Sequence, residues 1–170
     1  AGKTQLPDFQ RGWVWDNDHI CSLLASISLS FPIGAVMLLQ TGGEARFKPR
    51  LIEGVVTNNG TEPERLILDG QQRLTSLFQA LFSGQVVDTR DSRGYPLKRW
   101  YYLDIKKALD PALDREDAIV SLPEDKIVRN FRGEMEYDYS TPEKEYEAEL
   151  LPMPLVLSNE LMNWQMGYFQ

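Results

Sequence analysis

The chain of 170 residues contains one cysteine and one histidine. Because Cys21 has no second cysteine to pair with, no disulfide can form within the chain, and nothing in the composition requires an oxidising compartment. The single histidine, His19, excludes a self-contained nuclease centre of the HNH type and a zinc site made of Cys and His ligands. It also excludes a Ser-His-Asp triad, unless His19 itself serves in one. Chemistry in this chain would therefore depend on carboxylates, amides and arginines.

Long hydrophobic runs are also absent from the sequence. The longest candidate, Ile33 to Leu39, has the length of a buried strand and falls far short of the roughly 18 to 20 residues of a membrane-spanning helix. The first residues, Ala1 to Gln5, carry neither the basic nor the apolar part of a signal peptide. We therefore expect a cytoplasmic location and no membrane partner. The hydrophobic share of 42% is that of a globular chain, large enough for one domain or for a domain with a smaller appendage.

Basic residues are outnumbered, since 18 Lys and Arg face 25 Asp and Glu and give a formal net charge of −7. Wide, non-specific binding of a nucleic-acid backbone usually needs a basic face, so this charge argues against it. The distribution is uneven, however. Acidic residues concentrate between Gly133 and Glu149, whereas Arg46, Lys48 and Arg50 form a short basic cluster. One local anion site therefore remains compatible with the charge.

Hydrophobic spacing predicts one helix and three strands before residue 70. Asp16 or Asn17 can cap a helix that ends before Pro32, and its apolar face follows helical spacing at Ile20, Leu23, Leu24 and Ile27. The predicted strands span residues 33–39, 51–57 and 65–69, and the last two are joined across Asn58-Asn59-Gly60, a strong turn signal.

After Gly70 the apolar period changes to that of a helix. Leu74, Leu77, Phe78 and Leu81 share one face, which we expect to be buried, and Gly84 stands where a glycine that ends a helix belongs. Arg65 to Gly84 is therefore the best-defined unit of the chain: a strand, a turn and a helix. Beyond it we expect a polar surface connection at residues 85–97. Strands are predicted at residues 100–105, 119–122, 126–128 and 131–139, with a charged helix from residue 141 and a last amphipathic helix from residue 158.

The turn from Asp69 to Arg73 has the composition of an anion site. Gly70 lets the backbone approach a ligand, and the free N–H groups of the following helix attract negative charge. Gln71 and Gln72 would bring amide donors, and Arg73 a planar fork that matches phosphate oxygens. Asp69 could hold Mg²⁺ or orient a water, and a glutamine can position an attacking water. The same residues also suit an ordinary capped helix start, so the pattern alone leaves both interpretations open.

A second Gln-Arg pair, Gln10-Arg11, lies close to Trp13 and Trp15. Gln10 and Arg11 could complete an anion pocket, with Trp13 or Trp15 stacking on a base. The alternative is that the aromatic side chains anchor the core while Arg11 extends into solvent.

The two segments together resemble a known family. Leu6-Pro7-Asp8-Phe9-Gln10-Arg11 with Trp15, then Pro32-Ile33-Gly34, then Leu68-Asp69-Gly70-Gln71-Gln72-Arg73-Leu74-Thr75 is similar in order and spacing to the N-terminal domain of GmrSD-type, modification-dependent restriction enzymes, which carry a DGQQR motif. The resemblance covers about residues 6 to 84 and is loose beyond them. It implies a ParB/sulfiredoxin-like core over residues 1–84, with residues 85–170 as an α/β extension of the same domain, within an α+β fold.

In that fold the equivalent turn reads Gly-Glu-Arg-Arg in ParB proteins, which bind CTP, and Gly-Cys-His-Arg in sulfiredoxins, which bind ATP. The shared glycine corresponds to Gly70 and the shared arginine to Arg73, while Gln71 replaces the sulfiredoxin cysteine, so sulfinic-acid reduction is not expected. The family resemblance implies binding and hydrolysis of a nucleoside triphosphate with Mg²⁺. Asp69, Gln71 and Gln72 would then be catalytic, with Asp69 also the metal ligand.

Phosphates would be held by Gln10, Arg11, Gly70, Gln72 and Arg73. The DNA-cutting HNH module of the family lies in a separate C-terminal region, which we expect as a partner beyond Gln170, and modified DNA would be reached through the full-length protein. A non-catalytic module that senses modified DNA or a partner subunit is the alternative, because no residue is an unambiguous general base. A basic rim of Arg11, Arg46, Lys48 and Arg50 would favour it, whereas a closed pocket over Arg73 would favour hydrolysis. A purely structural fragment would leave both Gln-Arg pairs unexplained.

Overall fold

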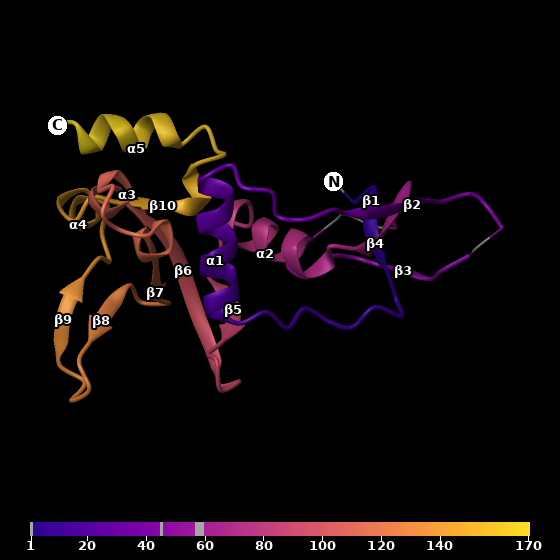
Figure 1. Ribbon diagram of the computed structural model, residues 1–170, viewed down its shortest axis with the longest axis horizontal. Helices are drawn as coiled ribbons and strands as arrows, with labels where there is room; N and C mark the ends of the chain where they lie inside the picture. Colours follow the sequence, from indigo (N-terminus) through magenta and orange to yellow (C-terminus); the bar gives the residue numbers. More distant parts are fainter. Residues whose placement is uncertain (1, 45, 57–59) are drawn as a thin grey trace.

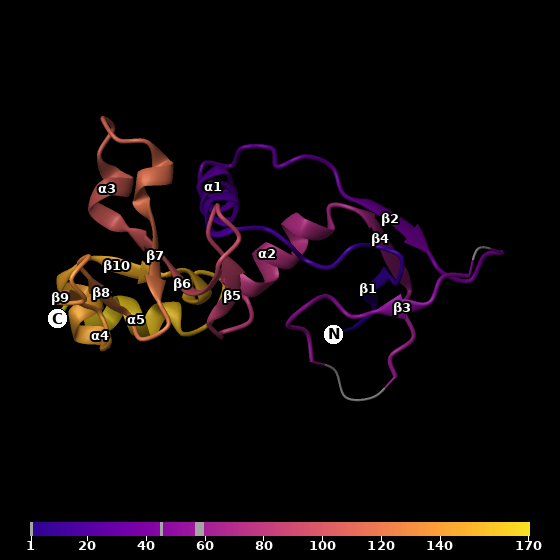
Figure 2. The ribbon, with the colours of Figure 1, turned by 90° about the horizontal axis from the view of Figure 1, so that it is seen from below.

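A computed structural model of the chain describes residues 2–44, 46–56 and 60–170 (Figure 1). The molecule is elongated, with a small sheet at one end, a second sheet at the other, and α1 (Asn17–Ser28) and α2 (Gln71–Leu81) between them (Figures 1 and 2). Helices and sheets thus mix in an α+β arrangement, as the sequence predicts. The longest helix in the described ranges, α1, has 12 residues, and none there could cross a membrane.

The small sheet is mixed and has the strand order β2-β4-β1-β3. Its strands are β1 (Thr4–Pro7), β2 (Met37–Gln40), β3 (Pro49–Arg50) and β4 (Arg65–Asp69). β4 runs parallel to β1 and antiparallel to β2, and β1 runs antiparallel to β3. Leu6, Leu66 and Ile67 are buried, so the two central strands hold the apolar side of this sheet.

The second sheet is antiparallel and is built around the long strand β6. Its members are β5 (Val87–Arg90), β6 (Pro96–Asp104), β7 (Ile119–Pro123) and β10 (Leu150–Pro152). β7 pairs along one edge of β6, while β5 and β10 pair with successive parts of β6. A separate hairpin, β8 (Ile127–Arg129) with β9 (Met135–Asp138), projects from this end of the molecule (Figure 1).

Helix ends follow the local chemistry of the sequence. Asp16 caps α1, because its carboxylate accepts the N–H of His19 at 2.9 Å. Pro142 occupies the first turn of α4, where its missing N–H costs nothing. The other helices are α3 (Ile105–Leu109), α4 (Pro142–Glu147) and α5 (Leu161–Tyr168), with 3-10 turns at Arg115–Ala118 and Met153–Leu155. α5 lies across the end of the second sheet (Figure 1).

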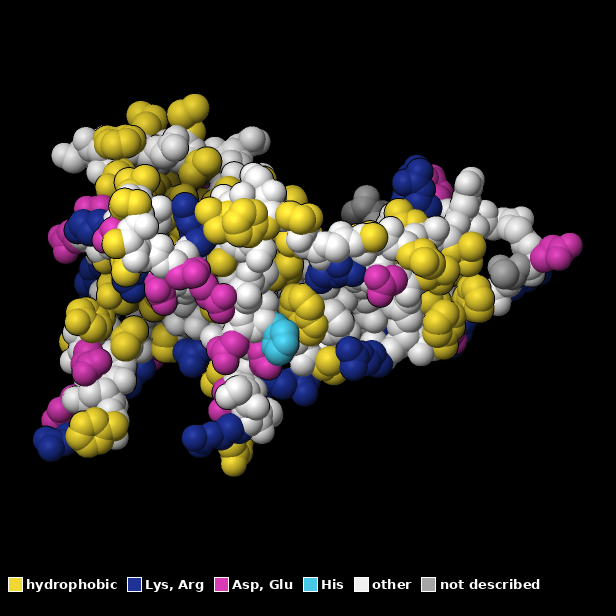
Figure 3. Space-filling model, in the orientation of Figure 1, with side chains coloured by type: hydrophobic (Ala, Val, Ile, Leu, Met, Phe, Trp, Pro, Cys, Tyr) yellow, Lys and Arg dark blue, Asp and Glu magenta, His cyan; other side chains and the backbone are white. Residues whose placement is uncertain are grey.

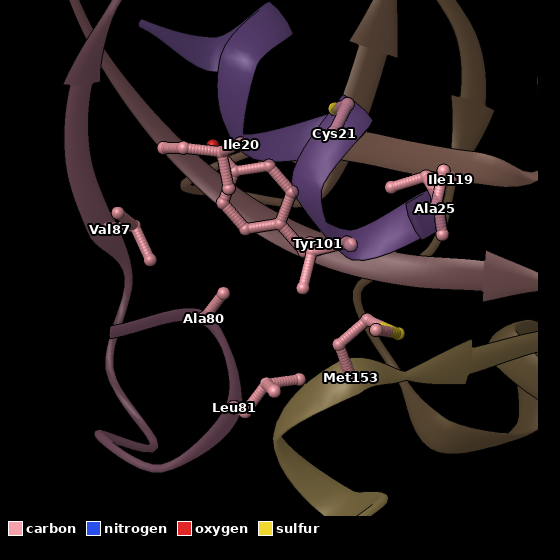
Figure 4. Close-up of a cluster of buried hydrophobic side chains, with 10 residues drawn as sticks. Ile20, Cys21, Ala25, Ala80, Leu81, Val87, Tyr101, Ile119 and Met153 are labelled. Carbon is pink, nitrogen blue, oxygen red and sulfur yellow. The ribbon is translucent and has the colours of Figure 1, made fainter. Parts of the chain in front are cut away.

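The main hydrophobic core joins the two halves of the chain. Helices α1 and α2 pack there against the second sheet, through Ile20, Cys21, Leu24, Ala25, Ala80, Leu81, Val87, Tyr101, Ile119 and Met153 (Figure 4). Residues before and after Gly84 contribute to it alike, so this core lies across the predicted boundary at residue 84. Desolvation in it raises the pKa of the Cys21 thiol to about 12, which makes that thiol inert near neutral pH.

Two of the predicted strands are wrong in part or whole. The strand predicted from Ile33 begins only at Met37, because the backbone before it accepts side-chain hydrogen bonds instead of strand hydrogen bonds. Within residues 51–56 the structure has a turn rather than a strand, in which the N–H of Val55 donates to Ile52. The hairpin predicted between that segment and β4 is therefore replaced by pairing of β4 with β1 and β2; Thr57, Asn58 and Asn59 of its turn lie outside the described residues.

The helix after Gly70 is confirmed, but its buried face is not the predicted one. Leu81 is buried, whereas Leu74, Leu77 and Phe78 are only half-buried. The fully covered positions are Gln71, Thr75, Ser76, Ala80 and Leu81. α2 lies between two sheets, so the N-terminal loop covers small and polar positions that would face solvent on a surface helix.

Later in the chain, the predicted polar connection at residues 85–97 is wrong. It contains β5 and the start of β6, which pair as a hairpin around a turn closed by Asp91. The polar side chains of β5 made this strand difficult to predict, because one face of it is exposed to solvent. Strands are confirmed near 100–104, 119–123 and 127–129, but the strand predicted at 131–139 covers only Met135–Asp138.

Candidate phosphate site at the start of helix α2

Gly70 is the hinge between β4 and α2. Its φ of 90° lies in the left-handed region, and a Cβ there would come within 3.1 Å of the Val36 side chain. Glycine is therefore required for both conformation and space. Because glycine carries no side-chain oxygen, no side chain caps the first N–H groups of α2. At the end of β4, the Asp69 side chain is 69% exposed and points away from the core.

Three glutamine side chains tie the N-terminal loop to this turn. The Gln10 amide donates to the carbonyls of Ile67 and Leu68 at 2.7 and 2.8 Å. The buried Gln71 amide donates to the carbonyl of Arg11 at 2.8 Å. The sequence thus correctly predicts that Gln10 and Arg11 lie beside the Asp69–Arg73 turn, across nearly sixty residues of chain.

The Gln72 amide binds the same loop through both its nitrogen and its oxygen. Its Nε2 donates to the carbonyl of Gly12 at 3.1 Å, and its Oε1 accepts the N–H of Val14 at 2.9 Å. The amide groups of Gln10, Gln71 and Gln72 are therefore committed to the main chain, a use that the motif alone does not reveal.

Arg73 is likewise bound to the main chain. Its guanidinium donates to the carbonyls of Ile33 and Ala35 and pairs with Asp69 at 3.1 Å. Gly34, with a φ of 93°, lies between those carbonyls, and a Cβ at this position would overlap the guanidinium. Gly34 and Arg73 thus form a matched pair that shapes the segment before β2.

A pocket of about 380 Å³ opens in front of these residues. Its lining comes from the N-terminal loop and from the turn, namely Phe9, Gln10, Arg11, Trp15 and Leu68 to Arg73. Arg11 is its exposed cation, and the Arg11 guanidinium makes no hydrogen bond within the described residues. Arg11 and the helix start therefore remain open to an anion.

The two candidate tryptophans separate. Trp15 lines the pocket and stands 5.6 Å from the ring of His19. Trp13 lies outside the pocket lining, and its indole N–H donates to Ser76 at 2.9 Å. Both tryptophan rings also pack against the main core. Of the two, only Trp15 is positioned to meet a ligand in this pocket.

Sequence reasoning missed a supporting ion pair beneath the loop. Arg50 pairs with Glu53 at 2.8 Å and also donates to the carbonyls of Gln10 and Arg11. Glu53 in turn accepts the N–H of Trp13 at 3.1 Å. Arg50 is thus used internally and does not form a free basic rim with Arg46 and Lys48.

Mg²⁺ would find a single carboxylate at this pocket. Over residues 2–44, 46–56 and 60–170, no group of three or more His, Cys, Asp or Glu side chains could hold a metal. Asp69 alone fits Mg²⁺ only in combination with phosphate oxygens, since this ion is commonly bound by one or two carboxylates plus a phosphorylated substrate. A metal here would therefore need oxygen ligands from a phosphorylated molecule to complete its coordination.

Comparison with known proteins identifies the family. The family model of the GmrSD restriction endonuclease N-terminal domain matches residues 1–158. The chain belongs to this family. The chain is also 30% identical over 173 aligned positions, or 98% of its length, to the uncharacterized protein MJ0686 of Methanocaldococcus jannaschii. It spans 28% of that relative's length. No solved structure matches the chain.

Proposed function

We propose that the pocket at the start of α2 binds a nucleoside triphosphate and supports its hydrolysis. The observation that carries the proposal is the convergence of Gln10, Arg11 and the Asp69–Arg73 turn around one pocket at an uncapped helix start. A helix N-terminus favours anions through its free N–H groups and its dipole. Arg11 adds an exposed positive charge at the same place.

The hydrogen bonds indicate different roles for the main chain and the side chains. Gly70 and the N–H groups of Gln71 and Gln72 would contact phosphate, and Arg11 would close over it. The side chains of Gln10, Gln71, Gln72 and Arg73 act as positioning groups, because each is bound to a carbonyl of the surrounding backbone. Trp15 would supply a ring for the base.

Asp69 is the group best suited to the chemical step. Its exposed carboxylate can take Mg²⁺ together with phosphate oxygens or orient the attacking water. Phosphoryl transfer depends mainly on positioning and electrostatic stabilisation, so a site without a strong general base remains competent. The Gln71 and Gln72 amides would fix the turn around that reaction.

We further propose that the small mixed sheet and α2 represent a ParB/sulfiredoxin-like core. A strand that ends at Asp69 and leads through Gly70 into a helix with Arg73 in its first turn supports this assignment. In the full-length protein, such a module would serve an anti-phage, modification-dependent restriction system. Its partners would be modified DNA and a C-terminal HNH nuclease region.

A non-catalytic sensing module is the second candidate. It is favoured by one observation: four polar side chains, Gln10 of the N-terminal loop and Gln71, Gln72 and Arg73 of the turn, are already satisfied by backbone groups, as a structural clamp would require. Such a module would recognise modified DNA or a partner subunit without turnover.

Titration of labelled ATP, GTP and CTP with Mg²⁺ against designed variants separates these functions. Arg11→Ala should weaken binding about ten- to a hundredfold, the value of one charge-assisted phosphate contact. Asp69→Asn should reduce hydrolysis more than binding. Arg46→Ala, an exposed arginine outside the pocket, is the matched control and should bind as the unaltered protein does. Unchanged binding in a folded Arg11→Ala protein, with circular dichroism as the check, would favour the sensing module.

A further inference from the structure

A second cavity lies between α5 and the second sheet and shares no residue with the pocket at α2. Its volume is about 420 Å³. Five aromatic residues, Trp100, Tyr101, Tyr102, Tyr146 and Trp164, line it, with prolines and Leu155 between them. Aromatic walls with a few polar groups are typical of small-molecule sites of this size. The function proposed for α2 gives this cavity no role.

A buried carboxylate lies in the wall of this cavity. Glu145 is only 4% exposed, and its Oε1 accepts the hydroxyl of Tyr102 at 2.7 Å and the ammonium of Lys126 at 2.8 Å. The Lys126 ammonium lies 5.5 Å from the ring centre of Trp100 and 5.7 Å from that of Tyr102. The protein thus places its own cation over these two rings, so they are not open to a cationic ligand.

The charges of the lining argue against an anion as well. Two carboxylates, Glu145 and Glu160, face one ammonium, Lys126. A phosphate or carboxylate would add negative charge beside Glu145, where burial makes repulsion strong. An uncharged ligand is the remaining class.

One polar feature of the cavity wall remains unexplained by packing. The indole N–H of Trp164 is buried, and no hydrogen-bond partner for it is found in the part of the chain that the structure describes. An unpaired buried donor costs free energy that a ligand acceptor would recover.

We propose that this cavity binds an uncharged, planar heterocycle of the nucleobase class. The aromatic walls offer surfaces for stacking a base. The Asn163 amide already donates one N–H to Glu160 at 3.1 Å, so its second N–H and the indole N–H of Trp164 can donate to a carbonyl or ring nitrogen. Because Tyr102 and Lys126 both bind Oε1 of Glu145, its Oε2 can accept from an exocyclic amino group. The base could come from a free nucleoside or from a nucleic-acid strand.

Fluorescence titration tests the proposal, since two of the chain's four tryptophans line the cavity. The probes are adenosine, guanosine, cytidine and thymidine. Asn163→Trp should fill the cavity mouth and weaken binding at least about tenfold, a loss of about 1.4 kcal/mol. Met166→Trp, at a 60% exposed position of the same helix, is the matched control and should leave binding unchanged. Arg11→Ala should also leave it unchanged, which separates this cavity from the pocket at α2.

A duplex with a fluorescent aminopurine opposite an abasic site distinguishes the two sources of the base. A fluorescence rise that Asn163→Trp abolishes identifies a base drawn from a strand, whereas nucleoside binding without that rise identifies the free ligand. The proposal is overturned if neither probe responds at millimolar concentration. It is equally overturned if Asn163→Trp leaves the responses unchanged, or if Met166→Trp removes them to the same extent.

Discussion

The two ends of the molecule use polar side chains in opposite ways. Around the small sheet, the side chains of Gln10, Gln71, Gln72 and Arg73 donate to backbone carbonyls of neighbouring segments, which are strand β4 for Gln10 and loops for the other three. Beside the second sheet, the buried polar side chains bind one another: the Glu145 carboxylate accepts hydrogen bonds from Tyr102 and Lys126. The strands of the second sheet already satisfy their backbone through long antiparallel pairing.

This difference follows from how much regular structure each end contains. The small sheet has strands of two to five residues and long irregular connections, whose buried carbonyls need side-chain donors. A ligand at that end would therefore meet mainly backbone N–H groups and Arg11. At the other end, strand pairing satisfies the hydrogen bonds of the backbone, so side chains would contact a ligand directly.

The largest expected effect is at Glu145. Glu145→Ala would leave the Lys126 ammonium and the Tyr102 hydroxyl without their shared acceptor, and should lower the free energy of unfolding by about 3 kcal/mol. Chemical denaturation measures it. Glu145→Gln keeps the shape and an acceptor, and should lose less than half as much. Equal losses in the two variants would contradict a role for the acceptor.

Arg73 should come next, and its loss tests the clamp at the other end. The sequence motif predicts that Arg73 holds phosphate, but the structure joins this side chain to the carbonyls of Ile33 and Ala35. We expect a loss of about 2 kcal/mol, the value of charge-assisted hydrogen bonds that are partly solvated. Hydrogen exchange should increase at residues 33–36 before it increases in the second sheet. Uniform exchange would show that the clamp is not local.

A smaller effect is expected where α5 meets α4. A Cβ at Gly167 would come within 2.5 Å of the Tyr146 hydroxyl, so Gly167→Ala must push the two helices apart. Overpacking of this kind costs about 1 to 3 kcal/mol, and we expect the low end because α5 can shift. The test is a red shift of tryptophan emission as Trp164 becomes exposed. Gln165→Ala on the same helix is the control and should leave the spectrum unchanged.

The smallest effect concerns the cap of α1 and depends on pH. Burial alone would raise the pKa of Asp16, but hydrogen bonds and charge from His19 outweigh it and lower that pKa. A lowered pKa in the folded state gives stability that is full above the unfolded value of about 3.9 and is lost as the pH falls through the folded value.

Asp16→Ala should therefore cost about 1 kcal/mol near neutral pH, as for other N-cap residues. The difference from the unaltered protein should shrink below about pH 4. Thermal unfolding across that range measures it. Asp16→Asn keeps an uncharged cap and should flatten the pH dependence without the full loss; a cost that is independent of pH would exclude the carboxylate as its source.

Several features of the site could be predicted from the sequence because they depend on local rules. The change of period at Gly70 fixed the end of β4 and the start of α2. Paired Gln-Arg motifs indicated that Gln10 and Arg11 meet that turn. The GmrSD family was also identified from these residues, and the family match over residues 1–158 confirms it.

Other features depend on tertiary contacts that no local pattern contains. The role of Arg73 could not be predicted, because its acceptors at Ile33 and Ala35 are backbone groups some forty residues away. The N-terminal loop also buries Thr75 and Ser76 on α2, which made the leucine stripe a poor guide to burial. Trp13 could not be assigned to the core, because the hydrogen-bond partner of its indole nitrogen, Ser76, lies 63 residues further along the chain.

The position of β1 has a consequence for the order of folding during synthesis. β1 is a central strand of the small sheet, yet both neighbours, β3 and β4, are made much later. Thr4 to Pro7 therefore cannot pair with β4 until Arg65 to Asp69 has emerged from the ribosome, and only then can the parallel pair of strands form. Closing so long a loop adds only about 0.6 kcal/mol for each doubling of its length, so the delay is in timing more than in stability. The nascent segment around β1 would remain open to chaperones and proteases throughout that interval.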